Sequence, residues 1–290
     1  MSTSVEGGGT IIDLHSHILP GIDDGAPVLS VAIDMARAYL DQNVGYVVCT
    51  PHIFPGLYHN SGPEIRAAVA RLQDDLAQAG LDLQLFPGAD NHMVPTFVDD
   101  LVGGKLLAIA DTRYVLVEPP HHVAPARMDR FFADLLTAGY VPLLTHPERL
   151  TWIEQKYELV RALARAGVWM QVTTGSLTGN FGRRARYWAE RMLDDGLVHV
   201  LASDAHDVGK RAPDIASGWR AAEALVGTTE ARHLLATRPI GVLRNLATDE
   251  IPLPHGVQSE SEIDTDAGAR PLSRGGSAHG LAGRLRRLLD

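Results

Sequence analysis

Short apolar runs rich in valine, isoleucine and leucine recur between residues 10 and 204, and longer segments with helical periodicity lie between them. Strands are expected over residues 10–15, 46–50, 83–88, 114–118, 141–146, 168–174 and 198–204. Helices are expected over residues 30–41, 63–79, 126–138, 154–166, 183–195, 213–226 and 229–237. Nearly continuous apolar strands that alternate with helices predict a parallel sheet that is buried on both faces.

Seven such units favour one large α/β domain over two small ones, because strand–helix barrels reach about 250 residues as a single domain. The prediction is a distorted (β/α)7 TIM-like barrel over residues 11–246, preceded by a flexible N-terminal segment at residues 1–10. An open, doubly wound sheet is the alternative arrangement of the same elements.

The composition changes after residue 246, where apolar residues become too sparse to form a core. Residues 249–266 contain six acidic and no basic residues, whereas residues 270–287 contain five arginines and no acidic residue. Such segments cannot bury enough apolar surface to fold. Residues 247–290 are therefore predicted to form a disordered, low-complexity tail.

Charge and cysteine content exclude several classes of protein. The net charge is −9, and nucleic acids and anionic membranes both attract clustered basic residues, so neither is an expected partner. The N-terminus lacks the features of a signal peptide, and no run approaches the roughly 20 apolar residues of a transmembrane helix. The single cysteine, Cys49, excludes an intramolecular disulfide and is consistent with a cytoplasmic protein.

The thirteen histidines change this picture, because several of them fall at one kind of position. In a parallel α/β barrel, functional residues lie at the carboxyl ends of the strands and in the loops that follow. Every predicted strand except the one at residues 168–174 ends close to a histidine or a carboxylate. The candidate metal ligands are His15, His17, Asp24, His52, Asp90, Glu118, His146, Asp204 and His206.

Nine nitrogen and oxygen ligands are too many for one ion, and they predict two or three divalent cations that share bridging carboxylates. A ligand set without thiolates suits manganese, iron or zinc. Closely spaced ions of this kind generate a hydroxide at neutral pH and neutralise a phosphoryl oxyanion. The pattern therefore predicts a metal-dependent phosphomonoester hydrolase.

Six segments of the sequence are similar to motifs of the PHP (polymerase and histidinol phosphatase) family. They are DLHSHILPGIDDG (13–25), TPH (50–52), LVEPP (116–120), THPERL (145–150), GSLTGNFGRRA (175–185) and SDAH (203–206). Within that family, the chain resembles the CpsB/CapC-type bacterial manganese-dependent protein-tyrosine phosphatases. The resemblance implies the PHP fold, Mn²⁺ as cofactor, and a phosphotyrosine protein as partner, such as a bacterial tyrosine kinase that controls capsule or exopolysaccharide synthesis.

The resemblance also implies a site with three ions. The implied ligand sets are His15, His17 and Asp204 for one ion, Glu118 and His146 for a second, and Asp24, His52 and His206 for a third. The family has a glutamate that bridges the first two ions at the position where this chain has Asp90. Aspartate is shorter by one methylene, so the bridge is in question, and His92 is a candidate to compensate.

Three residues are candidates for catalysis rather than for metal binding alone. Arg149 resembles the family's phosphate-binding arginine, and its guanidinium can neutralise two phosphoryl oxygens. The hypothesis is an attack on phosphorus by a metal-bound hydroxide, with His206 or Asp204 as proton donor to the leaving phenolate. The glycine-rich segment at residues 175–182 and the basic residues that follow it either bind phosphate or form a solvated helix face; these residues are Arg183, Arg184 and Arg186.

The sequence leaves three other functions open. A PHP phosphatase that acts on histidinol phosphate or on a nucleotide would carry the same ligands. An amidohydrolase-type barrel also begins with an H-x-H pair, but it often uses a modified lysine at a strand end, where this chain has none. The third alternative, suggested by Asp90, is a pseudo-phosphatase that binds metal or phosphotyrosine without turnover.

Overall fold

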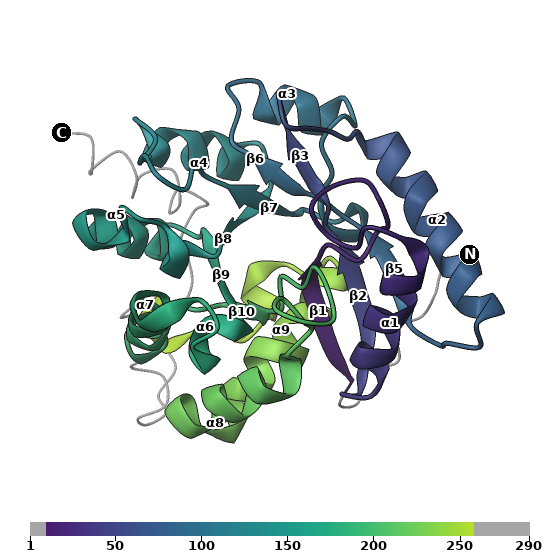
Figure 1. Ribbon diagram of the computed structural model, residues 1–290. Coiled ribbons are helices and arrows are strands. Elements are labelled where there is room, and N and C mark those ends of the chain that lie inside the picture. Colours follow the sequence, from purple (N-terminus) through teal and green to yellow (C-terminus); the bar gives the residue numbers. More distant parts are fainter. Residues whose placement is uncertain (1–9, 258–290) are drawn as a thin grey trace, which may run out of the picture.

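The computed structural model describes residues 10–257 and shows a mixed α/β fold (Figure 1). Each of the seven predicted strands is present, with bounds close to those expected. The strands are β1 (Ile11–Ser16), β2 (Val44–Cys49), β5 (Gln84–Pro87), β7 (Tyr114–Glu118), β8 (Val141–Thr145), β9 (Trp169–Thr173) and β10 (Val200–Ala202). The α/β class predicted from the apolar pattern is confirmed.

The structure adds three short strands, β3 (His52–Phe54), β4 (Tyr58–His59) and β6 (Asp90–His92). Strands β3 and β6 begin just beyond the ends of β2 and β5. β2 and β5 pair in a three-stranded sheet with the order β1-β2-β5, whereas β3 and β6 join a sheet with the order β10-β9-β8-β7-β6-β3-β4. Pro51 lies at the break between β2 and β3, and proline has no N–H with which to continue a ladder.

The two sheets form one curled wall. A parallel bridge between Ser16 and Ala205 joins the end of β1 to the segment after β10. The amide of His17 also donates a hydrogen bond to the carbonyl of Ala205 at 2.9 Å. The strand pairs of the wall are parallel, and the β3–β4 hairpin is antiparallel. The carboxyl ends of the parallel strands therefore lie at one edge of the wall.

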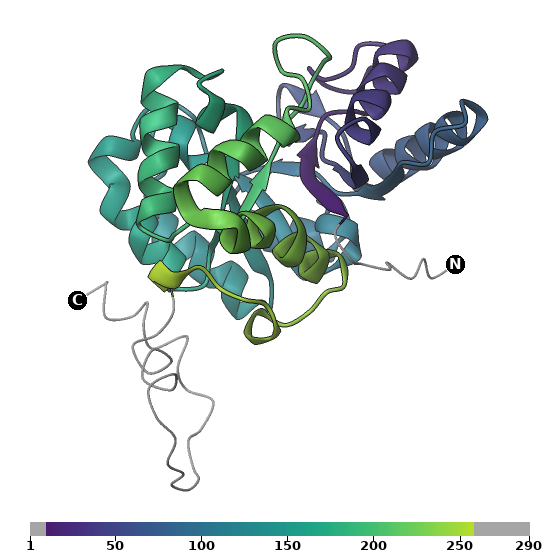
Figure 2. The same cartoon turned by 90° about the horizontal axis from the view of Figure 1, so that it is seen from below.

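Helices surround the curled wall (Figure 1 and Figure 2), except that the last one, at residues 238–243, lies against the inside of its curve. They are α1 (Leu29–Leu40), α2 (Gly62–Gln78), α3 (Phe97–Val102), α4 (Met128–Thr137), α5 (Ile153–Arg165), α6 (Thr174–Thr178), α7 (Gly182–Asp194), α8 (Ile215–Arg232) and α9 (Arg238–Leu243). Helix α8 contains the break expected after residue 226, at Gly227, whose φ of 80° glycine adopts readily. Among residues 10–257, no helix combines the length and the apolarity that crossing a bilayer requires.

The two faces of the wall belong to two apolar clusters. On β7, Tyr114 and Leu116 lie in an inner cluster together with Trp169 of β9. Val115 and Val117, which alternate with them, lie in the larger cluster that includes the helices. This alternation follows from the two-residue period of a strand. Because both faces are covered, the strands are apolar along most of their length, as the sequence pattern indicates.

Residues 247–257, which the sequence assigns to the disordered tail, pack against the rest of the protein. Ile251 is 4% exposed and belongs to the inner apolar cluster. The amide of Gly256 donates to the carbonyl of Gly196 at 3.1 Å. The end of the folded domain therefore lies beyond the predicted residue 246. The segment 247–257 has few apolar residues, but one of them, Ile251, still packs into the core. Residues 1–9 and 258–290 lie outside the described residues, and the prediction of a disordered tail remains a prediction for residues 258–290.

Arg238 connects this C-terminal segment to helix α8. Its side chain is fully buried, and its Nε donates to the carbonyl of Pro252 at 2.6 Å. Its two terminal nitrogens donate to the carboxylate of Glu230 at 2.7 and 3.0 Å. A bidentate pair of this kind is directional as well as strong.

We expect Arg238→Ala to lower the free energy of unfolding by about 3 kcal/mol, because it removes the guanidinium that pairs with Glu230 and binds the Pro252 carbonyl. Urea unfolding measures the change. The matched control is Arg37→Ala, which removes an exposed pair with Asp34 and is expected to cost less than about 1 kcal/mol. Equal losses in the two variants would contradict the prediction.

Candidate metal centre

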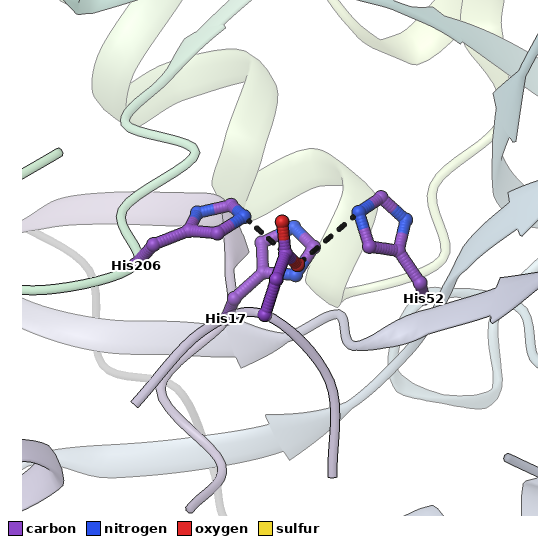
Figure 3. Close-up of side chains that lie close together, drawn as sticks. His17, His52 and His206 are labelled. Atoms are coloured by element: carbon purple, nitrogen blue, oxygen red, sulfur yellow. Dashed lines mark ion pairs between the residues drawn. The ribbon is translucent and has the colours of Figure 1, made fainter. Parts of the chain in front are cut away.

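The nine predicted ligands meet at the carboxyl edge of the curled wall. Three overlapping groups place their ligand atoms within 4.8 Å of one another: His17, Asp24, His52 and His206; His15, His17 and Asp204; and His52, Asp90 and Glu118. His146 lies beside them, with Nε2 at 3.8 Å from Asp90 Oδ2. Figure 3 shows His17, His52 and His206 turned towards one another. The groups differ from the implied ligand sets because His17 and His52 each belong to two of them.

His15 and His17 are oriented by oxygen atoms behind their rings. His15 Nδ1 lies 3.0 Å from Gln171 Oε1, and His17 Nδ1 lies 2.7 Å from Asp23 Oδ2. These oxygens accept the Nδ1 proton and leave Nε2 of each ring facing the site. The two Nε2 atoms are 3.1 Å apart and lie 3.3 and 3.2 Å from Asp204 Oδ1. Metal-binding histidines are typically held in this way.

The group around Asp24 is built on the same principle. His206 Nδ1 lies 2.9 Å from the backbone carbonyl of Asp204, so its Nε2 faces Asp24 Oδ1 at 3.4 Å. His52 Nε2 faces the same carboxylate oxygen at 3.6 Å. The loop that carries Asp24 passes close to strand β1, and a Cβ at Gly25 would lie 2.0 Å from the carbonyl oxygen of His17. Only glycine therefore allows this approach.

The third group contains buried polar atoms that lack partners. Asp90 is fully buried, and neither of its carboxylate oxygens has a hydrogen-bond partner among residues 10–257. Within the same described residues, Glu118 Oε2, His52 Nδ1 and His146 Nδ1 are also buried without a partner. A buried carboxylate without a donor or counter-charge is strongly destabilising. This donor set of imidazole and carboxylate therefore fits divalent cations, which would supply the missing charge.

Asp90 and Glu118 have opposite electrostatic environments. Burial raises the pKa of Asp90 well above its usual range, and the nearby charge of Glu118 raises it further. Burial acts on the pKa of Glu118 in the same direction, but His52 and His92 hold that pKa below its usual range. Without cations, these opposite shifts favour a proton on Asp90 over one on Glu118. A cation that binds both carboxylates would displace this proton.

His15 and His17 differ in the same way. Burial lowers the pKa of His15 to about 3, so this ring is neutral at physiological pH. Burial also acts to lower the pKa of His17, but Asp23 and Asp204 raise it to about 10. The metal-free protein therefore carries a proton on His17 that a cation must displace. The affinity for that cation should rise as the pH increases towards 10.

Two ligand candidates have a left-handed backbone. The φ angles are 35° for His146 and 53° for Asp204, in a region that residues with a side chain rarely adopt. Such strain costs about 1–3 kcal/mol per residue and is concentrated at functional sites. Below Asp204, the buried carboxylate of Asp13 accepts hydrogen bonds from the amide of Ser203 at 2.9 Å and from the hydroxyl of Tyr39 at 2.7 Å. These bonds anchor the strained turn to strand β1.

Two arginines flank the carboxylate of Asp204. Arg149 forms an ion pair with it, and the Arg149 guanidinium lies 4.5 Å from the centroid of the Phe181 ring. Arg211 donates to Asp204 Oδ2 at 2.6 Å. Burial acts to raise the pKa of Asp204, but Arg149 and the other nearby cationic groups hold it well below its usual range. Asp204 is therefore ionised at neutral pH.

The basic residues after the glycine-rich segment have structural contacts. Arg184 donates to the backbone carbonyls of Leu150 and Thr151 at 3.0 and 2.9 Å. Arg186 donates to Glu190 Oε1 at 2.7 Å on the exposed side of α7. For these two arginines, the structure therefore favours the helix-face interpretation over phosphate binding.

Sequence reasoning assigned no role to three residues that shape the site. Gln171 is a polar residue inside the apolar strand that has no ligand at its end, and this interruption was the available signal. Asp23 is adjacent to Asp24, and a pair of acids in a loop does not show which one faces the ions and which one orients a ligand. Arg211 lies in a loop whose pattern gives no signal, and its position depends on tertiary contacts.

We expect Asp23→Asn to weaken divalent-cation binding by about 10–100-fold, because an amide orients His17 less strongly than a carboxylate does. The pKa of His17 should fall as well, so cation binding near neutral pH should release fewer protons than in the wild type. Titration calorimetry in buffers of different ionisation enthalpy measures both quantities. Asp34→Asn, on the exposed face of α1, is the control. Unchanged affinity and unchanged proton release in Asp23→Asn would refute the role given to this carboxylate.

Comparison with known proteins shows which family the chain resembles over most of its length. Residues 11–244 match the family described as capsular polysaccharide synthesis, CpsB/CapC. The tyrosine-protein phosphatase YwqE of Bacillus subtilis is 36% identical over 201 residues, which are 69% of this chain and 79% of that protein. The tyrosine-protein phosphatase CpsB of Streptococcus pneumoniae is 26% identical over 238 residues, which are 79% of this chain and 96% of that protein.

A solved structure is also similar over most of the chain. It belongs to the crystal structures of YwqE from Bacillus subtilis and CpsB from Streptococcus pneumoniae, which are described as unique metal-dependent tyrosine phosphatases. The match has a TM-score of 0.79 and 34% sequence identity, and it covers 82% of this chain and 96% of that one. With the family match over residues 11–244 and the shared fold, the chain belongs to the CpsB/CapC family.

Proposed function

We propose that this chain is a metal-dependent protein-tyrosine phosphatase. The observation that carries the proposal is the convergence of nine histidine and carboxylate side chains with Arg149 at one edge of the sheet. The names of the relatives YwqE and CpsB, both tyrosine-protein phosphatases, support the same activity. The family description refers to capsular polysaccharide synthesis. We therefore propose a phosphotyrosine protein of that process, such as a tyrosine kinase, as the substrate.

The curled wall is best interpreted as a distorted (β/α)7 barrel of the PHP type. The bridge between Ser16 and Ala205, which links β1 to the segment after β10, supports closure. Successive pieces of two strands, β2 with β3 and β5 with β6, account for the distortion. We propose a single domain over residues 11–257, because residues 247–257 share its core.

Three divalent cations would fit the site, and we propose Mn²⁺ as the native ion. The proposed sets are His15, His17 and Asp204; Asp90, Glu118 and His146; and Asp24, His52 and His206. Bound cations of this type activate water as a nucleophile and neutralise phosphoryl oxygens. Two or three ions, rather than one, are needed to use all the unpaired donors of the site.

Arg149 is the residue that we propose binds the phosphoryl group. Phe181 and Asp204 fix its guanidinium beside the ligand groups, so its planar fork is oriented before substrate arrives. Arg211 lies on the other side of Asp204 and can neutralise further negative charge. Because the pKa of Asp204 is held well below its usual range, we assign Asp204 to positioning and not to proton donation.

The leaving phenolate needs little help from a proton donor. A phenolate has a pKa near about 10, so it leaves with less assistance than an alkoxide. His206 is the remaining candidate donor, and its Nε2 faces Asp24 at the mouth of the site. If His206 binds a cation through Nε2, water is the proton source.

Four exposed apolar residues favour a protein substrate over a small molecule. They follow different strands at the carboxyl edge, and we refer to them as the apolar rim: Val28 (53% exposed), Leu57 (60%), Val123 (69%) and Val208 (50%). Apolar side chains around a polar centre are typical of surfaces that contact another protein.

The wild type reconstituted with Mn²⁺ should hydrolyse p-nitrophenyl phosphate and a phosphotyrosine peptide, with a higher kcat/KM for the peptide than for histidinol phosphate. Arg149→Ala should lower kcat by about 10²–10³-fold, because the transition state loses its guanidinium. Arg66→Ala, which removes an exposed pair with Asp111, is the matched control. Failure of Mn, Fe, Co, Zn and Mg alike to support turnover, in the wild type and in Asp90→Glu, would leave the pseudo-phosphatase alternative standing.

The double variant Leu57→Ser/Val123→Ser should raise KM for the phosphotyrosine peptide about tenfold, because each substitution removes apolar contact area. KM for p-nitrophenyl phosphate should change little, since this substrate does not extend to the rim. Leu225→Ser is the control, because Leu225 is exposed near Asp194, at the end of α7 remote from the site. Parallel changes in KM for both substrates would argue against the rim as a protein-binding surface.

A further inference from the structure

His92 is a partly buried imidazole, 14% exposed, at the edge of the metal centre, and none of the proposed ligand sets uses it. It lies on β6 two residues after Asp90, so both side chains project to the same side of the strand. In the pairing of β6 with β7, His92 stands directly opposite Glu118. Its ring is stacked on Phe54, with 3.8 Å between centroids and 7° between planes. The ring plane is therefore fixed by strand register and by stacking.

The fixed ring directs one nitrogen at the centre. His92 Nδ1 lies 3.6 Å from Glu118 Oε2, which is too long for a hydrogen bond but suits two donors that share an ion. Both atoms are buried, and neither has a hydrogen-bond partner in the described part of the chain. An unpaired nitrogen opposite an unpaired carboxylate oxygen is unfavourable for both unless a third species lies between them.

His52 cannot supply the same nitrogen while it serves the Asp24 group. A neutral imidazole has one nitrogen lone pair, and the other nitrogen carries a proton. If His52 Nε2 binds the cation beside Asp24, its protonated Nδ1 faces Glu118 Oε2 at 3.4 Å and Asp90 Oδ2 at 3.6 Å as a donor. The cation beside Asp90 and Glu118 then has His146 as its nitrogen ligand.

Asp90 stands between two of the ligand groups, so its two oxygens would be shared by neighbouring ions and not reserved for the one beside Glu118. Its Oδ2 lies 3.6 Å from His15 Nε2 and 3.8 Å from His146 Nε2, between two of the ligand groups. Its ligand atom already lies within 4.8 Å of those of Glu118 and His52. Asp90, Glu118 and His146 would offer this cation three side chains, and His92 Nδ1 is a further buried nitrogen beside Glu118 without a hydrogen-bond partner among the described residues.

We propose that His92 is a metal ligand, which binds through Nδ1 the cation held by Asp90, Glu118 and His146. This inference rests on the metal centre proposed above. A glutamate at position 90 would reach further than Asp90 does, and the nitrogen of His92 takes the place of that contact. An imidazole in place of a carboxylate oxygen also changes which metal the cation site of Asp90, Glu118 and His146 prefers. Imidazole ligands suit zinc, iron and cobalt better than they suit manganese.

The test is metal binding by the full chain in the absence of substrate. Metal-free wild type and His92→Phe are titrated with Mn²⁺ and with Zn²⁺ by calorimetry, and bound metal is counted after dialysis by mass spectrometry. Phenylalanine keeps the stack on Phe54 and removes the nitrogen. We expect His92→Phe to bind one ion per chain at least tenfold more weakly, with a larger loss for Zn²⁺ than for Mn²⁺. His59→Phe, at an exposed ring on the neighbouring hairpin, is the control and should bind as the wild type does.

A second variant separates ligation from folding. Asp90→Glu in the His92→Phe background lengthens the carboxylate by one methylene and should restore the weakened ion, which a purely structural defect would not allow. Urea unfolding of the metal-free variants checks that the fold is retained. Equal metal content and affinity in wild type and His92→Phe would overturn the inference, as would failure of Asp90→Glu to restore binding. Metal binding without any turnover by the wild type would contradict the proposed function and leave the ligand assignment of His92 in place.

Discussion

The structure depends on the neutralisation of three carboxylates at one edge of a parallel sheet, the buried Asp90 and Asp204 and the partly buried Glu118. A buried ion without a partner costs several kcal/mol, which is a large share of the stability of a domain. Asp204 meets this demand with two arginines and two imidazoles. Asp90 has no donor among the described residues. The polar atoms of the site therefore lack partners until cations bind. The same cations that would neutralise the carboxylates would also supply the chemistry.

Apolar packing in the rest of the fold stabilises the carboxyl edge of the strands, where these carboxylates lie. The strands are buried on both faces, and the inner apolar cluster extends to Ile251 in the C-terminal segment. Strained backbone at His146 and Asp204 is kept in place by this packing and by the hydrogen bonds of Asp13. The unpaired carboxylate of Asp90 and the strained residues His146 and Asp204 lie at the carboxyl edge of the strands, whereas apolar packing dominates in the inner cluster. Barrel folds separate function and stability in the same way.

The ligands of the site could be predicted because their spacing is local. His15 with His17, and Asp204 with His206, are placed on one side by the geometry of an extended chain. The supporting contacts could not be predicted in this way. Gln171 lies 156 positions from His15, and Arg211 reaches Asp204 from a loop of irregular structure. Which histidine serves which ion is equally non-local, because His17 and His52 each face two groups.

The sequence by itself determined the order of strands and helices, the α/β class and the identity of nine converging polar residues, because each of these follows from short-range periodicity. Tertiary structure decided the broken strands β2/β3 and β5/β6, the packing of residues 247–257, and the partners of Asp23 and Arg149. It also decided the orientation of His92, which requires the register between β6 and β7 together with the stack on Phe54. These features depend on contacts between segments far apart in the chain, and a pattern along one segment carries no record of such contacts.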